Sequence, residues 1–286
     1  MIKKIVPYYL IAILFSWSLF VVTDAWLIPK YAGTGFVKLI ALYGHILAML
    51  GPFAAGIISL KFILKKKTLT FKAGDQKYYS YAIYGAIILW ILPAIIWFVF
   101  DKGVIFKTGF NYYDKVFIVT YLAFGWVAGM GEEYGWSAYL LSEISETAGR
   151  TRAVIISGIL RGLWHLPLFI IPVYLKAGAG SRSLIMMLII AAALSLQLII
   201  SNIFFSSLFG YVWYETESIP LLGWMHFLFD IGRDFALLFF IGFNGSLWFK
   251  IGWGIPFYLL AYLALYSIYK KEGFSRPAEV FGIRQK

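Results

Sequence analysis

Two adjacent carboxylates, Glu132 and Glu133, lie in the segment GEEYGWSAYL, inside a long apolar stretch. An ionisable side chain at membrane depth costs several kcal/mol, so it usually faces a polar cavity and has a partner. Two histidines in later apolar stretches, His165 and His226, are the best partners in this sequence. A carboxylate base in a low dielectric and two imidazoles are the parts needed to activate a water and to stabilise an oxyanion.

Metal and nucleophile chemistries have weaker sequence support. Glu132, His165 and His226 are reasonable zinc ligands, so zinc stays an option, but the HExxH helix motif that strengthens a metal site is absent. No GxSxG is present for a serine nucleophile, and Asp75 lies in a basic loop rather than in a span, where an aspartyl mechanism would need it. The chain has no cysteine, which excludes thiolate ligands and cysteine nucleophiles. No cofactor is required by the pattern.

The spacing of these polar residues places them in pairs and in one layer. His226 and Asp230 are four residues apart and share a helix face, as do Arg161 and His165. If both chain ends lie on the same side, a rise of 1.5 Å per residue puts Glu132 about 14 Å, and His165 about 18 Å, from that side. His226 and Asp230 then lie at about 12 Å and about 18 Å. Reversing the orientation moves all of them together, so the agreement in depth does not depend on it.

The elements that position them are predicted to be transmembrane helices. Of 286 residues, 61% are hydrophobic and only 14% charged, and the apolar residues come in blocks separated by short polar connections. This composition predicts an all-α, polytopic integral membrane protein with about eight transmembrane helices around a polar intramembrane cavity. We expect one membrane domain, residues 1–286, with a core at 116–242 that carries the site. The expected spans are 5–27, 38–63, 78–100, 116–141, 153–175, 184–213, 218–242 and 247–269.

The net charge of +11 does not indicate a nucleic-acid partner, because the lysines and arginines lie mostly in loops that flank the spans. More of them lie on the side that carries both chain ends, in particular in the basic run 61–77 and after residue 270. The positive-inside rule therefore predicts a multi-pass protein of the cell (plasma) membrane with both termini in the cytoplasm. The lipid bilayer is its expected surrounding.

Three motifs occur in order along the chain: GEEYGWSAYL, then RGLWHLPLF, then GWMHFLFD. Together they resemble the CPBP family of membrane proteins, whose signatures are EExxxR, FxxxH, and HxxxN or HxxxD. That family contains the CAAX prenyl endopeptidases and Abi-like bacterial proteins linked to bacteriocin processing or self-immunity. The resemblance covers roughly residues 115–245, and the other helices match only in character.

The resemblance implies an intramembrane endopeptidase that hydrolyses a peptide bond of a peptide or membrane-protein substrate, in a cavity that faces the cytoplasm. Carried over by position, Glu132 activates the water together with His165, and no covalent intermediate forms. His226 and Asp230 bind or polarise the scissile carbonyl, and Glu133 supports the first carboxylate. Members of the family were once described as metalloproteases and are now more often described as glutamate-dependent.

Two positions depart from the family pattern. Ser137 stands where the first motif has arginine, and Arg161 stands where the second motif has phenylalanine. We hypothesise that Arg161, one turn before His165, supplies the cation that Ser137 lacks by pairing with Glu133 across two helices.

Other interpretations stay open at this point. The loss of the motif arginine favours a non-catalytic, CPBP-like immunity or binding protein, whereas the intact Glu-Glu pair and the two histidines favour an enzyme. A transporter is a third class and fits less well. Arg233, three residues after Asp230, offers that aspartate a structural ion pair. His45, outside the motifs, is expected to be packed and hydrogen-bonded.

Overall fold

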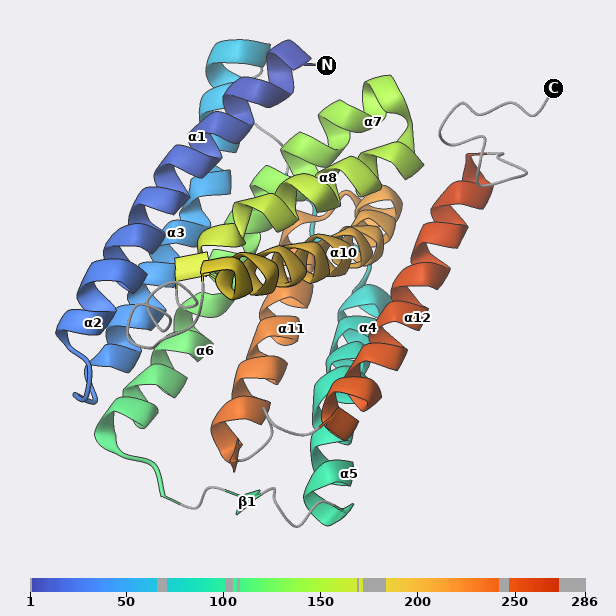
Figure 1. The fold of residues 1–286 in the computed structure, drawn as a ribbon. Helices are drawn as coiled ribbons and strands as arrows, with labels where there is room; N and C mark the ends of the chain where they lie inside the picture. Colours follow the sequence, from blue (N-terminus) through green and yellow to red (C-terminus); the bar gives the residue numbers. More distant parts are fainter. Residues whose placement is uncertain are drawn as a thin grey trace.

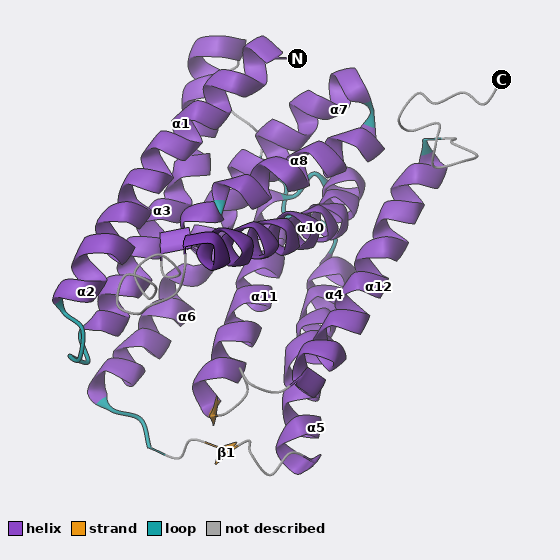
Figure 2. Ribbon diagram, in the orientation of Figure 1, coloured by secondary structure: helices purple, strands orange, loops and turns teal. Residues whose placement is uncertain are grey.

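The computed structural model describes residues 2–65, 71–100, 105–106, 109–168, 170–171, 184–241 and 247–272. Nearly all of these residues are helical (Figure 2). The only strands in these ranges, β1 (Ile105–Phe106) and β2 (Phe240–Ile241), form one short antiparallel pair. The protein is therefore all-α in the part that the structure describes, as the composition predicts.

The helical runs follow the expected spans closely, and four of them contain a π-helical segment (η). In chain order they are α1 (Ile2–Phe20) with η1 (Val21–Leu27) and α2 (Ile28–Lys30); α3 (Val37–Ser59) with η2 (Leu60–Leu64); α4 (Gln76–Ala86), η3 (Ile87–Ile91) and α5 (Leu92–Phe100); α6 (Tyr112–Glu133), η4 (Tyr134–Leu141) and α7 (Ser142–Ala148); α8 (Arg150–Trp164); α10 (Leu184–Thr216); α11 (Ile219–Phe239); and α12 (Leu247–Lys271). The expected span 153–175 is matched by α8 as far as Trp164, and its end, 172–175, lies outside the described residues.

Three helices are long and apolar enough to cross a membrane by length and composition, within the described ranges. They are Ile2–Lys30, Val37–Leu64 and Leu188–Thr216. Their outer faces carry large apolar side chains that are more than half exposed, among them Leu14, Trp26 and Leu188. Such faces are stable against lipid tails, which are as apolar as the side chains themselves. The structure is therefore that of an all-α membrane protein.

The helices pack side by side in an order that places α6 at the centre of the site. α6 lies between α3 and α11 and packs against both, while α1 packs against α3 (Figure 1). α10 crosses the view in front of α11 and packs against α8 and α12. The first residues of α1 and the last of α12 lie at the same end of the bundle (Figure 1).

Two close helix crossings depend on glycine. A Cβ at Gly223 of α11 would lie 2.7 Å from the backbone nitrogen of Met130 in α6, and one at Gly129 would lie 2.7 Å from the Gly223 carbonyl oxygen. Small residues at such contacts let two backbones approach closely. This crossing lies only three residues from both Glu132 and His226, so it sets the distance between the two helices at the site.

The second crossing joins α8 to α10 in the same way. A Cβ at Gly158 would lie 2.4 Å from the Ile203 Cα atom, and one at Gly162 would lie 2.7 Å from the Ile199 Cα atom. Because Gly162 follows Arg161 directly, this contact fixes the part of α8 that carries the arginine.

Gly223→Ala should destabilise the protein, because its new Cβ meets the backbone nitrogen and Cα atom of Met130 as well as its side chain, and the backbone cannot move aside easily. Overpacking of this kind costs roughly 1–3 kcal/mol. The measurement is the thermal unfolding midpoint of the purified protein in detergent, followed by tryptophan fluorescence. Gly85→Ala in α4 is the matched control, since a Cβ there meets nothing within 4 Å, and it should leave the midpoint unchanged or raise it slightly. Equal midpoints for the two variants would contradict the role of the crossing.

Candidate active site

Glu132 and Glu133 are the last two residues of α6, and the π-helical segment η4 begins directly after them. Neighbouring side chains on an α-helix point about 100° apart. Even so, both carboxylates are buried, with exposed fractions of 1% and 0%. π-helical segments often occur at functional sites, where they change the register of a helix locally. Two adjacent buried carboxylates at such a segment require cations or donors close by.

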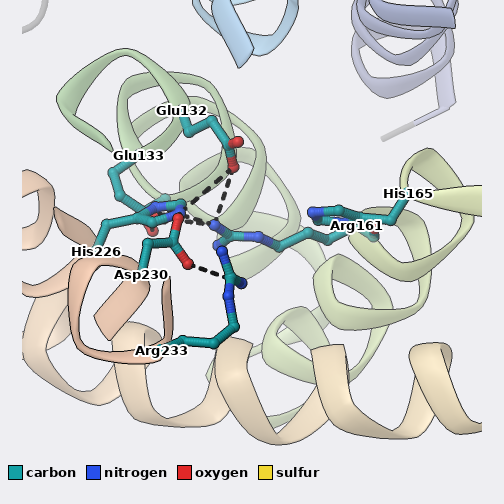
Figure 3. A network of polar contacts seen from close by, with 8 residues as sticks. Glu132, Glu133, Arg161, His165, His226, Asp230 and Arg233 are labelled. Carbon is teal, nitrogen blue, oxygen red and sulfur yellow. Dashed lines mark hydrogen bonds and ion pairs between the residues drawn. The ribbon is translucent and has the colours of Figure 1, made fainter. Parts of the chain in front are cut away.

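Arg161 of α8 supplies that cation. Its Nη2 atom donates to Glu133 Oε1 at 2.7 Å and to Glu132 Oε2 at 3.1 Å (Figure 3). The guanidinium also packs on the Phe205 ring, with its Cζ atom 4.4 Å from the ring centroid. The predicted pairing of Arg161 with Glu133 across two helices is therefore confirmed, and the same nitrogen reaches Glu132 as well.

His226 of α11 completes this cluster from the opposite helix. Its Nδ1 atom lies 2.9 Å from Glu133 Oε1, and its Nε2 atom lies 3.3 Å from Asp230 Oδ2 and 4.0 Å from Glu132 Oε2. Each ring nitrogen thus faces a carboxylate oxygen. The prediction that these helices bring their polar side chains together is confirmed for Glu132, His226 and Asp230, and Glu133 and Arg161 lie in the same cluster.

Asp230 has a second partner on its own helix. Arg233 Nη1 lies 3.1 Å from Asp230 Oδ1, so the ion pair expected between these residues is present (Figure 3). Arg233 also donates from Nε to Asp234 Oδ1 at 2.7 Å. Its side chain is 42% exposed, in contrast to the fully buried Arg161. Asp230 therefore joins a buried network on one side to a half-exposed ion pair on the other.

His165 lies beside this network and not within it. Its Nδ1 atom donates to the carbonyl oxygen of Arg161 at 2.8 Å, and Figure 3 shows the ring on the far side of Arg161 from His226. In the neutral imidazole, Nε2 is then left as an acceptor. His165 has no hydrogen bond or ion pair with Glu132 among its described contacts. The predicted cooperation of His165 with Glu132 therefore depends on the cavity between them.

One cavity of about 410 Å³ connects these side chains. Glu132, Arg161, His165, His226 and Asp230 all line it, whereas Glu133 does not. We expected its wall to come from the four helices between residues 116 and 242, but α1, α3, η3 and α12 also contribute to it. The wall is mostly apolar and includes Phe20, Leu42, Met49, Phe117, Phe205 and Phe257.

The two carboxylates differ in how many of their oxygens take part in hydrogen bonds and ion pairs. Glu133 Oε1 accepts from Arg161 and His226, and Glu133 Oε2 accepts from Ser137 Oγ at 2.5 Å. Glu132 makes its contacts with Arg161 and His226 through Oε2. Its Oε1 atom has no hydrogen-bond partner among the residues that the structure describes. Glu132 is thus the carboxylate with spare acceptor capacity at the cavity wall, and Glu133 is the one that fixes the network.

A zinc site built from Glu132, His165 and His226 does not fit this arrangement. The Arg161 guanidinium lies within hydrogen-bond distance of Glu132 and 3.3 Å from His226 Nδ1, so a divalent cation there would meet a permanent positive charge. Among the described residues, no group of three or more His, Asp or Glu side chains is arranged to hold a metal ion.

Sequence reasoning missed part of this cavity. His45 is hydrogen-bonded to Asp24, as a packed histidine should be, but the same side chain also lines the cavity. An aspartate and a histidine inside two apolar spans were the available signal. Tyr121, three turns before Glu132 on α6, is a second polar residue of the wall that the motifs do not contain.

The comparison with protein families agrees with the motif resemblance. Residues 114–232 match the family described as type II CAAX prenyl endopeptidase Rce1-like. This match supports a membrane protease of the CPBP family. The match contains every residue of the buried network, from Glu132 to Asp230, and it places a protease-family domain among apolar helices. No curated protein matches the chain.

Replacing the buried cation of the Rce1-like domain should be costly. Arg161→Leu leaves Glu132 and Glu133 buried without their cation, and removal of one partner of a buried pair costs roughly 3–5 kcal/mol. In detergent, we expect much less monodisperse protein and a much lower thermal unfolding midpoint. Arg233→Leu is the matched control and should lose less, because that side chain is 42% exposed. A wild-type midpoint for Arg161→Leu would show that the ion pair is not needed.

The position of the cation can be tested separately from its presence. Ser137, which stands at the arginine position of the family motif, already contacts Glu133. Adding Ser137→Arg to Arg161→Leu should recover a large part of the lost midpoint, because the guanidinium returns one turn away from Glu133. Ser137→Gln in the same background adds a long side chain without charge and should recover little. Equal recovery by the two double variants would argue against charge compensation.

Proposed function

We propose that this protein is an intramembrane endopeptidase of the CAAX type, in which Glu132 activates a water for hydrolysis of a peptide bond. The observation that carries this proposal is that both oxygens of Glu133 have partners, whereas only one oxygen of Glu132 does. Glu133 is saturated by Arg161, His226 and Ser137, while Glu132 keeps Oε1 available at the wall of the cavity. A general base needs such a position, within reach of a water and of the reacting carbonyl.

In the proposed step, Glu132 Oε1 takes a proton from the water, whose oxygen attacks the carbonyl carbon of the substrate. The carbon–nitrogen bond then breaks, and the proton passes to the leaving amine. No enzyme nucleophile forms a covalent intermediate. Arg161 keeps its contact with Glu132 Oε2 throughout, so that only the other oxygen faces the reaction. His165, whose Nε2 is an acceptor in the neutral ring, holds the water from the other side of the cavity.

His226 and Asp230 are proposed to polarise the scissile carbonyl. His226 Nε2 contacts Asp230 Oδ2 at 3.3 Å and lies 4.0 Å from Glu132 Oε2, both longer than a good N–H···O bond. A carbonyl oxygen of the substrate is a competitive acceptor at this nitrogen. Asp230 stays anchored to Arg233 while His226 turns toward the substrate.

The proposed setting is one membrane domain over residues 1–286, with eight spans and a core at 116–242. The cavity opens toward the cytoplasm, both termini are cytoplasmic, and the protein lies in the cell (plasma) membrane. The shared end of α1 and α12 supports same-side termini (Figure 1). The substrate is a peptide or a membrane protein.

A second candidate function is a binding or immunity protein that uses the cavity without cleavage. The extent of the ion-pair network favours it, because Arg161 is within ion-pair distance of Glu132, the proposed base. The two candidates differ in what they require of Glu132. A base must be a carboxylate, whereas a binding wall tolerates the isosteric amide.

Glu132→Gln should abolish proteolysis while leaving the fold intact, because the amide keeps the volume and can still accept from Arg161 but cannot take a proton. His165→Ala should lower cleavage strongly. The measurement is a comparison of protein termini by mass spectrometry, in membranes from cells that express wild type or either variant at equal levels. New termini in the wild-type sample alone would identify the substrates.

Expression and folding must be matched before these termini are compared, by fluorescence-detected size-exclusion chromatography of each variant. Tyr43→Phe, a change on α3 outside the cavity, should give the wild-type set of termini. If all samples carried the same termini while Glu132→Gln kept the wild-type phenotype of the cells, the binding-protein alternative would replace the protease.

A further inference from the structure

A second polar pair borders the cavity away from the motif residues. Asp24, in the π-helical segment η1, is buried, with 8% of its side chain exposed, and His45 of α3 faces it. The His45 Nε2 atom lies 3.0 Å from Asp24 Oδ1 and 3.3 Å from Oδ2. A carboxylate in an apolar helix needs a partner of this kind, and aspartates inside membrane helices commonly mark function.

Two independent features of the sequence bring this pair together. Asp24 and its neighbour Thr23 are buried in η1, whereas Val22 and Trp26 in the same segment face outward. A Cβ at Gly44, the residue before His45, would lie only 2.2 Å from Thr23 Oγ1. The π-helical turn and the glycine together allow α3 to approach η1 closely at this one level.

His45 is shared between this pair and the cavity. Its side chain lines the cavity and is 38% exposed, although its partner is buried. Its Nδ1 atom has no hydrogen-bond partner among the described residues. A histidine whose only task was to neutralise Asp24 would have no reason to keep its second nitrogen accessible.

The chemistry of the ring defines what this nitrogen binds. The Asp24 carboxylate only accepts, so Nε2 carries the proton, and in the neutral ring Nδ1 becomes an acceptor. The guanidiniums of the cavity, Arg161 and Arg233, only donate. A peptide lying in a mostly apolar cavity presents both C=O and N–H groups, and each unpaired group costs free energy. Donors serve the carbonyls, and the N–H groups need an acceptor such as His45.

We propose that His45, held by Asp24, is a substrate-binding residue that accepts a hydrogen bond from a backbone N–H group of a peptide in the cavity. This assignment rests on the proposed function, in that the cavity takes a peptide. It places His45 outside the catalytic group, because its described contacts include none of the motif residues. His45 orients the chain on the α3 wall, while Glu132 and His226 act on the scissile bond.

The test is a binding experiment that needs no cleavage. The Glu132→Gln protein in lipid nanodiscs is titrated with N-acetyl-Leu-Val-Phe-Ala-amide, and with analogues that carry one N-methyl group on each backbone nitrogen in turn. His45→Phe, added to Glu132→Gln, should weaken binding of the parent peptide about 3- to 10-fold, the size of one net hydrogen bond. One N-methyl analogue should bind more weakly by a similar factor to the Glu132→Gln protein, and this difference should disappear once His45→Phe is added.

Two further variants separate binding from folding. His45→Asn keeps a donor for Asp24 and an acceptor for the cavity, so it should retain most of the affinity. Tyr43→Phe, two residues away on α3, removes only the hydroxyl that contacts Thr120 and should not change binding. If His45→Phe lowered the midpoint but left the affinity and the N-methyl pattern unchanged, the pair would be structural only, and the proposal would be overturned. Absence of peptide binding in every protein would overturn it as well.

The outcome is distinguishable from that of the proposed function. If the wild-type protein cleaved substrates but peptide binding did not depend on His45, only the assignment of His45 would be wrong. If peptide binding depended on His45 but the protein produced no new termini in membranes, the assignment of His45 would be supported and only the proposed protease activity would be wrong.

Discussion

The structure depends on one buried charge arrangement, in which the Arg161 guanidinium faces the carboxylates of two consecutive glutamates. Desolvating these groups is expensive, and their attraction repays the cost only when the geometry is good and the remaining lone pairs are satisfied. A guanidinium suits such a position because its planar, delocalised charge is weakly hydrated and packs on aromatic rings, here on Phe205. The surrounding helices must then hold three backbones within the reach of one side chain. The glycine crossings of α6 with α11 and of α8 with α10 do this, and each lies within a turn of the residues it positions.

This arrangement gives two chemically identical neighbours different tasks. Glu133 is enclosed by Arg161, His226 and Ser137, so it is a fixed negative charge that orients the imidazole and the guanidinium. Glu132, which lines the cavity, shares the same cation through one oxygen, and its other oxygen has no hydrogen-bond partner among the described residues. The cation at this site comes from α8, and Ser137, one turn after Glu133, donates to Glu133 Oε2.

Much of this site follows from the sequence, because depth in a helical bundle is simply residue count multiplied by rise. The common layer of Glu132, His226 and Asp230 was predictable on that basis, and charge balance identified Arg161 as the partner of Glu133. Three features were not predictable. A π-helical segment of seven or eight residues is too short to show a hydrophobic period in the sequence, so neither η4 nor η1 could be located. The bond of His165 Nδ1 to the Arg161 carbonyl oxygen, in place of a bond to Glu132, does not follow from the spacing of the residues. The Asp24–His45 pair joins two helices that carry none of the motifs, so the sequence did not show which of their residues face each other.

The aromatic residues behind the network explain why a largely apolar cavity suits hydrolysis. Phe205 and Phe209 of α10 pack against His226, with ring centroids 5.6 Å and 5.8 Å away, and they also border the Arg161 guanidinium. They close one side of the ion pairs to water, so the polar atoms that remain available all face the cavity. A low dielectric strengthens the interactions of such atoms with a developing negative charge, because no bulk solvent competes for them. In the proposed reaction, a peptide against the apolar wall excludes bulk solvent, and the water between Glu132 and His165 is the nucleophile. Binding of the substrate and protection of the reaction from solvent are then consequences of the same apolar surface.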